Sequence, residues 1–382
     1  MKIAYFSNYF NHHQRPVAEA MNAIEGVEYI FVCTTEVPEF RKKLGYQEMT
    51  ANYVLDVTIS EENHRKAIEL ARTADVAIYG GGKAFDYIKN RLRQKKLTFE
   101  TSERRFKRGL INMLSPNLLK HLWIYWQYGR KAPFYMLSCS AYTANDFNFL
   151  GCFIDKCYKW AYFTKVKDLP IENVLEAKRQ PRCKIMWCSR FVAWKHPEMC
   201  IELAKRLTAD GADFEINMYG NGPLMEQYQQ KIQAEALSGC VHIMGNRNND
   251  EILAAMQQNN IFLFTSDRNE GWGAVANEAM SNGCTLVGSD QIGAVPFLIK
   301  NNVNGRIFKS RDIDSLYNAV NGLLTDRENC EQLALEAYAS MRNVWSPENA
   351  AKSLLILIND LQNGSNTSIT EGPCSKAEPF NN

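Results

Sequence analysis

Residues 261–280 have the sequence IFLFTSDRNEGWGAVANEAM, in which three kinds of segment follow one another. The first five residues are apolar or β-branched, which predicts a short buried strand over 261–265. A polar, glycine-containing loop follows, and residues 274–282 then have the pattern of a helix. A strand that leads through such a loop into a helix is typical of a parallel sheet covered by helices.

The same alternation runs through the whole second half of the chain. Short apolar runs that predict strands lie at 184–188, 215–219, 241–244, 261–265 and 285–288. Predicted helices lie between them, near 197–209, 222–236, 249–258 and 274–282. The first half follows the scheme less regularly, with a predicted helix at 16–24 and predicted strands at 3–7, 29–33, 75–79, 97–100 and 134–138. The sequence therefore predicts an α/β fold made of two Rossmann-like, doubly wound domains.

The length of 382 residues agrees with two such domains and a C-terminal extension. We predict a first domain over 1–170 and a second over 171–345, joined through the polar stretch 165–181. The apolar pattern within 346–362 predicts a C-terminal helix. Residues 363–382 are rich in Asn, Ser, Gly and Pro, so we expect them to form a disordered tail.

The net charge of +2 hides a difference between the two halves of the chain. Residues 1–180 carry 27 Lys and Arg against 19 Asp and Glu, whereas residues 181–382 carry 17 against 23. Twelve of the basic residues lie within 89–131, where Glu100 and Glu103 are the acidic ones. This distribution argues against an acidic, solvating chain and against a uniformly basic nucleic-acid coat.

Several protein classes are disfavoured by the composition. No run of 18 apolar residues predicts a transmembrane helix, and the first residues become polar too soon for a signal peptide. The eleven cysteines include no C-x-x-C pair, so we expect buried thiols in a reducing cytosol and not disulfides or zinc ligands. The six histidines are dispersed apart from His12 and His13, and we expect no metal site.

Candidate ligand-binding residues follow the strand predicted at 261–265. Doubly wound folds bind their ligands beyond the carboxyl ends of the strands, and Glu270 lies on the loop at this end. Glu278 lies in the helix that comes next, so the two acids could grip different parts of one ligand. Gly271 and Gly273 let a ligand approach the backbone, and the start of a helix favours an anion.

The ends of three earlier strands carry cations or glycines. Arg190 and Lys195 follow the strand at 184–188, and two fixed cations in this place suit a diphosphate. Glycine-containing turns follow the next two strands, at Gly220, Asn221 and Gly222, and at Gly245 and Asn246. Ordinary turns explain each of these features singly, but they explain the whole set poorly.

Taken together and in this order, these residues resemble the donor-binding domain of the retaining glycosyltransferases of family 4. The segment NYFNHHQ at 8–14 also resembles the first loop of family members from bacterial polysaccharide biosynthesis. The resemblance implies the GT-B fold, in which two Rossmann-like domains face a cleft. It also implies that the first domain binds the acceptor, that the second binds a nucleotide sugar, and that the helix within 346–362 packs back on the first domain.

The resemblance also implies roles for the candidate residues. Glu278 would hold the ribose hydroxyls, and Glu270 would hold hydroxyls of the transferred sugar. Arg190 and Lys195 would neutralise the diphosphate leaving group, which agrees with the charge that develops there. The cofactor-binding loop would consist of Gly271, Trp272, Gly273, Ala274 and Val275. We expect transfer from a UDP- or GDP-linked sugar without a metal or another cofactor, because cations and the start of a helix can stabilise the leaving group.

The chain also departs from the family pattern. Ser189 and His196 stand where the family usually has glycines, and Phe297 stands where many members have a third acid. The catalytic histidine of the first domain has no clear counterpart, and Glu103 is the candidate for its place.

His12 and His13 follow the first predicted strand, and two interpretations of them stay open. A histidine in this position could contact the donor phosphate or the acceptor, or it could satisfy a loop carbonyl. We keep His12, His13 and Glu103 as candidate residues of the acceptor side.

The basic segment 89–131 interleaves its cations with aromatic residues. One interpretation is a solvated helix face whose aromatic residues belong to the core. Another is a surface that docks on the anionic cytoplasmic leaflet of a membrane, where a lipid-linked acceptor would be embedded. Binding to nucleic acid is not expected, because no nucleic-acid-binding module accompanies the charge.

The sequence therefore predicts a metal-independent retaining glycosyltransferase of surface polysaccharide assembly. It would be cytoplasmic, associated with the inner leaflet, and would transfer a sugar to a glycan or polyprenyl-linked acceptor. Two alternatives remain: a nucleotide-sugar epimerase of the same architecture, and a non-catalytic partner subunit that binds a sugar nucleotide.

Overall fold

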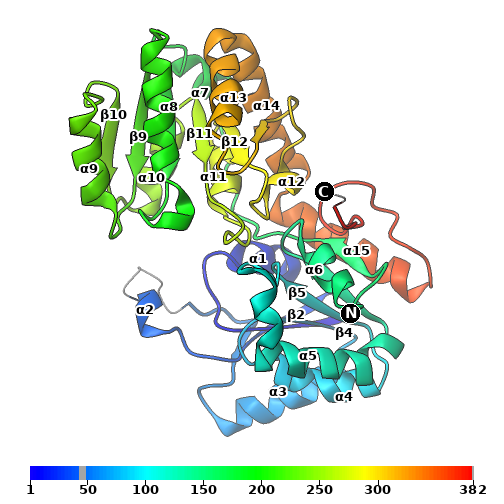
Figure 1. Cartoon of the computed structure of the whole chain (residues 1–382). Coiled ribbons are helices and arrows are strands. Elements are labelled where there is room, and N and C mark those ends of the chain that lie inside the picture. Colours follow the sequence, from blue (N-terminus) through cyan, green and yellow to red (C-terminus); the bar gives the residue numbers. More distant parts are fainter. Residues whose placement is uncertain (43–48, 381–382) are drawn as a thin grey trace. The chain divides into compact units, whose positions relative to one another are not determined.

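The computed structural model describes residues 1–42 and 49–380, apart from the side chains of Phe40 and Lys42. The chain folds into two compact units, each built on its own parallel sheet (Figure 1). Unit 1 consists of Met1–Lys165 and Val344–Asn382, and unit 2 consists of Val166–Asn343. The unit boundaries thus lie within a few residues of the predicted domain boundaries at 170 and 345.

Unit 1 contains a seven-stranded sheet with the order β3-β2-β1-β4-β5-β6-β7. All neighbouring strands pair in parallel. The strands are β1 (Lys2–Ser7), β2 (Glu28–Cys33), β3 (Val54–Asp56), β4 (Val76–Gly80), β5 (Thr98–Ser102), β6 (Phe134–Ser138) and β7 (Cys157–Lys159). The strand order reverses direction between β1 and β4, so the loops that follow these two strands diverge from one point of the sheet.

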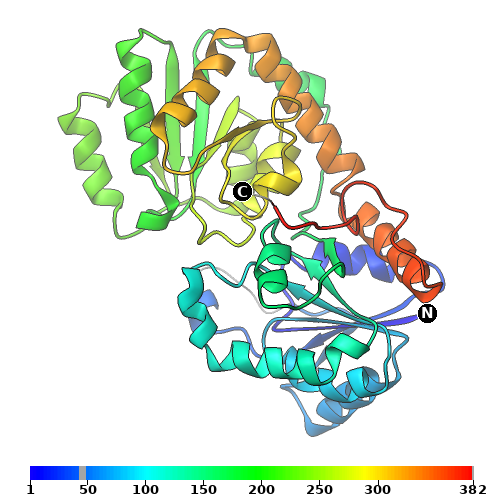
Figure 2. The same cartoon turned by 45° about the vertical axis from the view of Figure 1, so that its right-hand side comes forward.

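Helices cover the sheet of unit 1 on both faces (Figures 1 and 2). The α-helices of the first segment are α1 (Arg15–Asn22), α2 (Glu39–Lys42), α3 (Glu61–Thr73), α4 (Ile88–Arg93), α5 (Pro116–Gln127) and α6 (Thr143–Phe149). Three short 3₁₀ helices complete the segment: η1 (Ala84–Tyr87), η2 (Gly109–Leu114) and η3 (Gly129–Lys131).

Unit 2 contains a six-stranded parallel sheet with the order β10-β9-β8-β11-β12-β13. Its strands are β8 (Cys183–Cys188), β9 (Phe214–Tyr219), β10 (Val241–Gly245), β11 (Ile261–Phe264), β12 (Thr285–Ser289) and β13 (Arg306–Phe308). Counted from β8, this order is 3-2-1-4-5-6, which is that of dinucleotide-binding folds. Every residue of β11 is buried, as expected for a central strand covered on both faces.

The helices of unit 2 are α7 (Ile171–Ala177), η4 (Ala193–Lys195), α8 (Glu198–Ala209), α9 (Met225–Ala234), α10 (Asn249–Met256), α11 (Val275–Ser281), α12 (Val295–Leu298), α13 (Ile313–Thr325) and α14 (Arg327–Asn343). One apolar core joins the sheet of unit 2 to α8, α9, α13 and α14, four of the helices of this unit. The core includes Trp187 of β8, Ile201 of α8 and Leu316 of α13, all of which are buried.

The predicted fold class is confirmed, and every strand predicted from an apolar run is present in the structure. The sequence missed β3, β7 and β13, which have three residues each and are too short to produce a periodic pattern. The stretch 165–181 is not only a linker, because it contains α7. Ile171 and Leu175 of α7 are buried against Ala334 and Tyr338 of α14, which places this helix in unit 2.

The C-terminal segment belongs to unit 1. Helix α15 (Pro347–Gln362) packs against α1. The prediction of a disordered tail from residue 363 is wrong for most of that segment, while residues 381–382 lie outside the described residues. Cys374 is fully buried, its amide donates to the carbonyl of Lys159 at 2.8 Å, and Lys376 forms an antiparallel bridge with Tyr158. These backbone hydrogen bonds to β7 order a segment whose composition alone suggested none.

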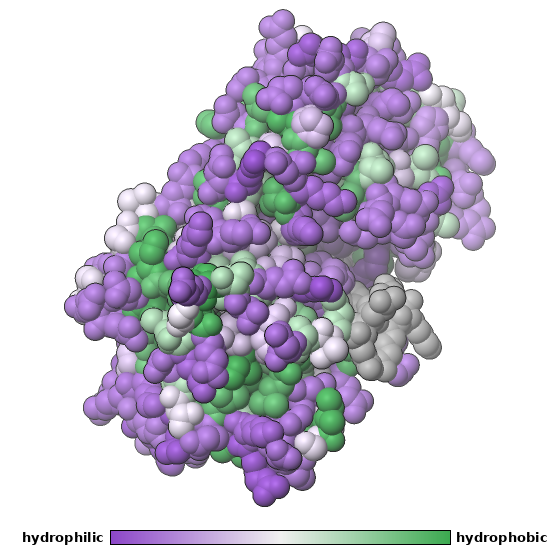
Figure 3. All heavy atoms as spheres, turned by 180° about the vertical axis from the view of Figure 1, so that it is seen from behind, coloured by the Kyte–Doolittle hydropathy of each residue, from purple (hydrophilic) through white to green (hydrophobic). Residues whose placement is uncertain are grey.

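The described residues also bear on the expectations about thiols, metals and membranes. All eleven cysteines are free, and nine of them are buried. Within residues 1–42 and 49–380, no group of three or more His, Cys, Asp and Glu side chains is arranged to hold a metal ion. No helix in the same ranges is long and apolar enough to cross a bilayer. Hydrophilic side chains cover most of the visible surface, with smaller apolar areas between them (Figure 3).

Candidate functional site

The candidate site of unit 2 lies at the carboxyl ends of β8 and β11, the neighbouring strands at which the strand order reverses. Loop 189–197 leaves β8 and loop 265–274 leaves β11. A buried hydrogen-bond chain holds the two loops together. The indole of Trp187 donates to the Thr265 hydroxyl at 2.9 Å, and that hydroxyl donates to the carbonyl of Lys195 at 2.6 Å.

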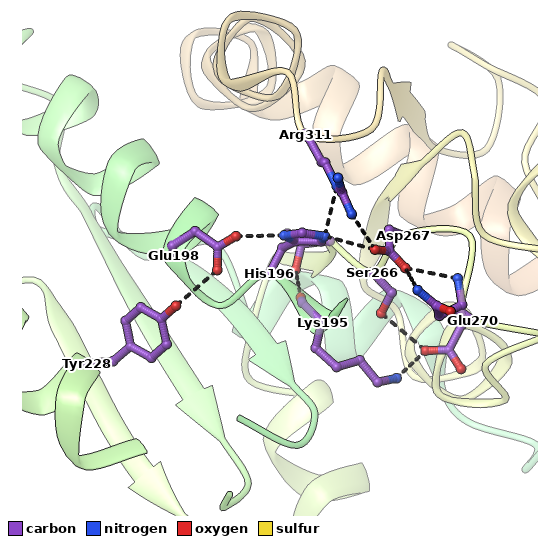
Figure 4. A network of polar contacts seen from close by, with 10 residues as sticks. Lys195, His196, Glu198, Tyr228, Ser266, Asp267, Glu270 and Arg311 are labelled. Atoms are coloured by element: carbon purple, nitrogen blue, oxygen red, sulfur yellow. Dashed lines mark hydrogen bonds and ion pairs between the residues drawn. The ribbon is translucent and has the colours of Figure 1, made fainter. Parts of the chain in front are cut away.

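Lys195 and Glu270 form an ion pair in this site (Figure 4). Both side chains are largely buried, with 11% and 12% of their surfaces exposed. The Ser266 hydroxyl donates to the same carboxylate oxygen of Glu270 at 3.1 Å, and the Lys195 ammonium lies 4.3 Å from the centre of the Trp194 ring. The structure thus brings together two residues that are 75 positions apart and that the sequence placed separately at strand ends.

Glycines shape the loops around this pair. Gly273 has φ +86°, and a Cβ there would lie 2.2 Å from the Phe264 ring, so no larger residue fits. Gly220 has φ +124°, and a Cβ there would lie 1.9 Å from the carbonyl oxygen of Ser189. The turn after β9 therefore packs directly on the backbone of the loop that carries Arg190 and Lys195.

A second network of polar contacts, centred on His196, joins the same two loops (Figure 4). His196 has a left-handed backbone, with φ 50° and ψ 53°. Its Nδ1 lies 2.6 Å from Glu198 and its Nε2 lies 3.3 Å from Asp267. The Tyr228 hydroxyl donates to Glu198 at 3.1 Å, and Arg311 donates to Asp267 at 2.7 Å. The hydrogen bond with Glu198 raises the pKa of His196, and Asp267 acts in the same direction.

Glu278 is half-buried on α11, and its carboxylate has no hydrogen-bond partner among the side chains of residues 1–42 and 49–380. Burial raises the pKa of Glu278 to about 7. Burial and the Glu278 carboxylate together raise the pKa of Cys188 to about 12, which places Glu278 beside the end of β8. A partly buried acid without a partner is a costly arrangement, and it is typical of a group that awaits a ligand.

The remaining candidates of unit 2 differ in how far their side chains reach solvent. Arg190 is exposed, with its guanidinium 5.7 Å from the centre of the Trp194 ring. Asn221 and Asn246 are exposed at the turns after β9 and β10. Trp272 is buried and donates to Asn277 at 2.8 Å, so its side chain belongs to the core. The other predicted loop residues are Gly222, Gly245, Gly271, Ala274 and Val275, of which Gly271 is buried and the others are partly exposed.

The acceptor-side candidates follow the carboxyl ends of strands in the sheet of unit 1, with His12 and His13 after β1 and Glu103 after β5. His12 is exposed and His13 is half-buried, with their ring centres 4.0 Å apart. Burial, together with His12 and Arg41, lowers the pKa of His13 to about 3. The His13 ring lies 6.4 Å from that of Tyr162, whose pKa is raised by burial and by the neighbouring Glu103 carboxylate. Glu103 also forms an ion pair with Lys107. Tyr162 therefore links the histidine loop to Glu103.

Known proteins resemble the half of the chain that carries the Lys195–Glu270 pair. The family model for glycosyl transferases group 1 matches residues 175–340. Residues 175–340 are therefore similar to a group 1 glycosyltransferase domain. The predicted resemblance of the second half of the chain to a glycosyltransferase domain is thus confirmed. The matched residues include Lys195, Glu270 and Glu278 of the candidate donor site.

The curated relatives that the chain matches are named as glycosyltransferases of different kinds. The chain is 27% identical over 191 residues to the amylovoran biosynthesis glycosyltransferase AmsK of Erwinia amylovora, covering 49% of this chain and 46% of the relative. It is 29% identical over 153 residues to the alpha-D-kanosaminyltransferase of Streptomyces kanamyceticus, covering 40% of this chain and 39% of the relative. The chain therefore spans less than half the length of these curated relatives.

Solved structures extend the likeness to both units. The Anabaena protein Alr3699/HepE in complex with UDP matches 94% of this chain and 100% of its own, with a TM-score of 0.67 and 15% identity. At this identity the likeness concerns the fold. Each unit of the chain is thus a parallel α/β domain of the kind found in GT-B glycosyltransferases.

The sequence missed several residues that position the pair in the glycosyltransferase domain. Glu198, Asp267 and Arg311 hold the loops through His196, and Trp194 lies against both cations. Arg311 lies 115 positions from His196, so no local spacing could have indicated the contact. His196 did give a signal, because it stands at a position where the family pattern has a glycine and where the backbone is left-handed.

Replacing His196 with glycine is expected to lower the stability of this domain at pH 6 more than at pH 9. Glycine tolerates the left-handed backbone, so the change removes mainly the imidazole and its two carboxylate contacts. The pKa of His196 is raised on folding, so its contribution is fully present below the unfolded pKa of about 6.5 and is lost as pH rises through the folded pKa. We expect a loss of about 1 to 2 kcal/mol at pH 6, measured by thermal unfolding. An equal loss at both pH values would contradict the assigned role.

Proposed function

We propose that the chain transfers a sugar from a UDP-linked donor to a glycan or lipid-linked acceptor, with retention of the anomeric configuration. The observation that carries the proposal is the Lys195–Glu270 pair at the point where the strand order of a group 1 glycosyltransferase domain reverses. UDP is favoured over GDP because the structural neighbour Alr3699/HepE was solved with UDP and with UDP-glucose.

The donor would lie across the carboxyl ends of β8 and β11. Transfer breaks the bond between the sugar C1 and the β-phosphate oxygen, and the electron pair stays on that oxygen. Lys195 and Arg190 would neutralise the charge that develops on this leaving group. Glu270 would accept hydrogen bonds from hydroxyls of the transferred sugar, and Glu278 would accept them from the ribose. Their partly buried positions support these roles, because hydrogen bonds to carboxylates are stronger away from water.

The diphosphate would have to open the Lys195–Glu270 ion pair. In the structure the Lys195 ammonium is paired with the Glu270 carboxylate. A bound donor would offer phosphate oxygens to the ammonium and sugar hydroxyls to the carboxylate. The phosphate would take over Lys195, and the hydroxyls would take over Glu270. Each charged group would exchange one polar partner for another, which limits the cost of removing them from water.

Unit 1 would supply the acceptor side, with the cluster of His13, Tyr162 and Glu103 as the candidate contact. The acceptor hydroxyl would form the new bond to C1 and pass its proton to the departing β-phosphate oxygen, which keeps the electron pair of the broken bond. A polyprenyl-linked acceptor would place the enzyme at the cytoplasmic face of the membrane, on the inner leaflet. The relative AmsK is named for amylovoran biosynthesis, and the surface polysaccharide assembly predicted from the sequence fits this placement.

Calorimetry with free nucleotides, followed by a turnover assay, tests the proposal. We expect UDP to bind with a dissociation constant of micromolar order and GDP to bind at least tenfold more weakly. We also expect slow release of UDP from its sugar when no acceptor is present. Absence of binding to any nucleoside diphosphate would overturn the proposal. Conversion of the donor into an epimer would identify an epimerase instead, and binding without any turnover of donor would identify a non-catalytic subunit.

A further inference from the structure

One face of unit 1 exposes large apolar side chains. Among the described residues, nine of the fifteen exposed large apolar side chains lie between positions 110 and 154. Those on η2 and α5 that are more than 40% exposed define what we call the apolar ridge: Leu110, Ile111, Leu114, Leu119, Trp123 and Trp126. Leu114 is 80% exposed and Trp123 is 53% exposed, so these side chains do not belong to the core.

Helix α5 is apolar on two faces, and only one of them is covered. Leu118, Ile124 and Tyr125 are buried in unit 1. Leu119, Trp123 and Trp126 follow one another at helical spacing and form a stripe on the outer face. In Figures 1 and 2 this helix runs along the outside of unit 1. Because the outer face of a surface helix is ordinarily polar, the stripe calls for a partner.

Cations surround the ridge. The Lys89 ammonium lies 5.3 Å from the centre of the Trp123 ring, and the Arg130 guanidinium lies 5.7 Å from that of Trp126. Arg108 and Lys131 are exposed at the two ends of η2 and α5. None of Arg108, Arg130 and Lys131 has a carboxylate partner among residues 1–42 and 49–380.

The acids of the same region are already engaged. Glu100 is buried and lies 3.1 Å from Arg105 and 2.9 Å from His121. Glu103 pairs with Lys107. Asp86 of η1 pairs with Lys120 of α5 at 2.8 Å. The charge that this face presents to a partner is therefore positive.

We propose that the apolar ridge inserts into the headgroup region of an anionic lipid bilayer. Tryptophans on a helix face with Lys and Arg beside them match the layered chemistry of that surface, with acyl chains below and phosphates above. The positive face favours this occupant over a second copy of the chain, which would place like charges against each other. The choice of the inner leaflet rests on the proposed function, whereas binding to the bilayer does not.

The two contributions to docking are separable. The aromatic stripe supplies affinity for any bilayer, and the cations supply the preference for anionic lipid. Arg91 plays no part in this preference, although it lies in the basic segment. It is fully buried, and its guanidinium donates to backbone carbonyls, including that of Ala74 at 2.8 Å. Arg104 is also buried. The sequence therefore overstated the docking charge of segment 89–131.

Co-sedimentation with vesicles tests the inference. We expect the full chain to bind vesicles of phosphatidylcholine with 30% phosphatidylglycerol at least tenfold more tightly than vesicles of phosphatidylcholine alone. The double variant W123S/W126S should lower binding to the anionic vesicles at least tenfold. The double variant I59S/I68S is the matched control, because it removes two exposed apolar side chains of unit 1 outside the ridge and should leave binding unchanged.

Three outcomes would overturn the inference: equal binding to neutral and anionic vesicles, full binding by W123S/W126S, or an equal loss in I59S/I68S. Dissociation of a dimer by W123S/W126S in sedimentation velocity, without vesicle binding by the parent chain, would assign the ridge to a second copy. Calorimetry with UDP is run in parallel on each variant. If vesicle binding fails while UDP binding is intact, the docking surface is refuted and the proposed function is not. If UDP binding fails while vesicle binding is intact, the proposed function is refuted and the docking surface is not.

Discussion

Replacing Lys195 with methionine is expected to lower the rate of sugar transfer by a factor of about 10² to 10³. The ammonium is the largely buried cation of the candidate donor site, and it lies beside Glu270 and the Trp194 ring. Once the donor has displaced Glu270, this ammonium would stabilise the charge that develops on the diphosphate, so its removal should affect the transition state more than the bound donor. The measurement is kcat with a saturating UDP-sugar, compared with the dissociation constant for UDP. A loss confined to the dissociation constant would contradict the assignment.

The same substitution leaves the Glu270 carboxylate largely buried without its cation, which alone lowers stability by about 1 to 3 kcal/mol. The double variant K195M/E270Q is the matched control, because the neutral amide no longer needs a cation. We expect the double variant to recover most of the stability and none of the activity. Recovery of both would mean that the pair serves the fold and not the chemistry.

Replacing Glu278 with glutamine is expected to stabilise the protein above pH 7 while weakening UDP binding by about 10- to 100-fold. Hydrogen bonds to a charged group contribute about 1.5 to 3 kcal/mol, and the amide loses that part of the ribose contact. Without ligand, the ionised carboxylate is unfavourable in its half-buried place, and the amide removes this penalty. The substitution should therefore raise the stability of the protein and lower its affinity for UDP.

The pH dependence of both quantities follows from the pKa of Glu278. Folding raises this pKa from its ordinary value of 4.5 to about 7, so the folded state binds more protons between these two pH values. Stability therefore falls as pH rises through this window and is lowest above pH 7. Since Glu278 is partly exposed, we expect the glutamine variant to gain about 1 to 2 kcal/mol at pH 8 and little near pH 4.5.

Thermal unfolding at pH 4.5 and pH 8 measures the stability difference, and calorimetry at pH 6 and pH 8 measures UDP affinity. Between pH 6 and pH 8 the affinity of the parent chain should rise more steeply than that of the glutamine variant, because Glu278 ionises in the parent in addition to the terminal phosphate of UDP. A glutamine variant that is less stable than the parent at pH 8, or that binds UDP equally well, would remove Glu278 from the ribose site.

The fold was predictable because its central strands are buried on both faces and therefore appear as continuous apolar runs. β11 is the clearest case, with all four residues buried between two helical layers. The three-residue strands β3, β7 and β13 could not be found in this way. They exist because longer neighbours offer them hydrogen bonds, and that information does not lie in their own residues. The C-terminal tail illustrates the same limit, since its order depends on the backbone of β7.

The candidate site was predictable in its members but not in their arrangement. Position after a strand indicated Lys195 and Glu270, because parallel strands end at one edge of the sheet. Their direct pairing depends on the order in which β8 and β11 lie side by side, which local sequence does not record. The network around His196 joins residues from four separate segments, and no spacing rule connects them. The burial of Arg91 and Trp272 could not be predicted from their residue types either.

Unit 1 is assembled from two segments, and this sets an order of events during synthesis. Its first segment ends at Lys165, and its second begins at Val344, after the whole of unit 2. At about 5 to 20 residues per second, a ribosome adds the intervening residues in roughly 10 to 40 s. During that delay α1 lacks α15 and the edge strand β7 lacks its partner from the tail, while unit 2 can already close its core. Nascent chains should therefore depend on chaperones mainly through unit 1, although most of its residues are made before those of unit 2.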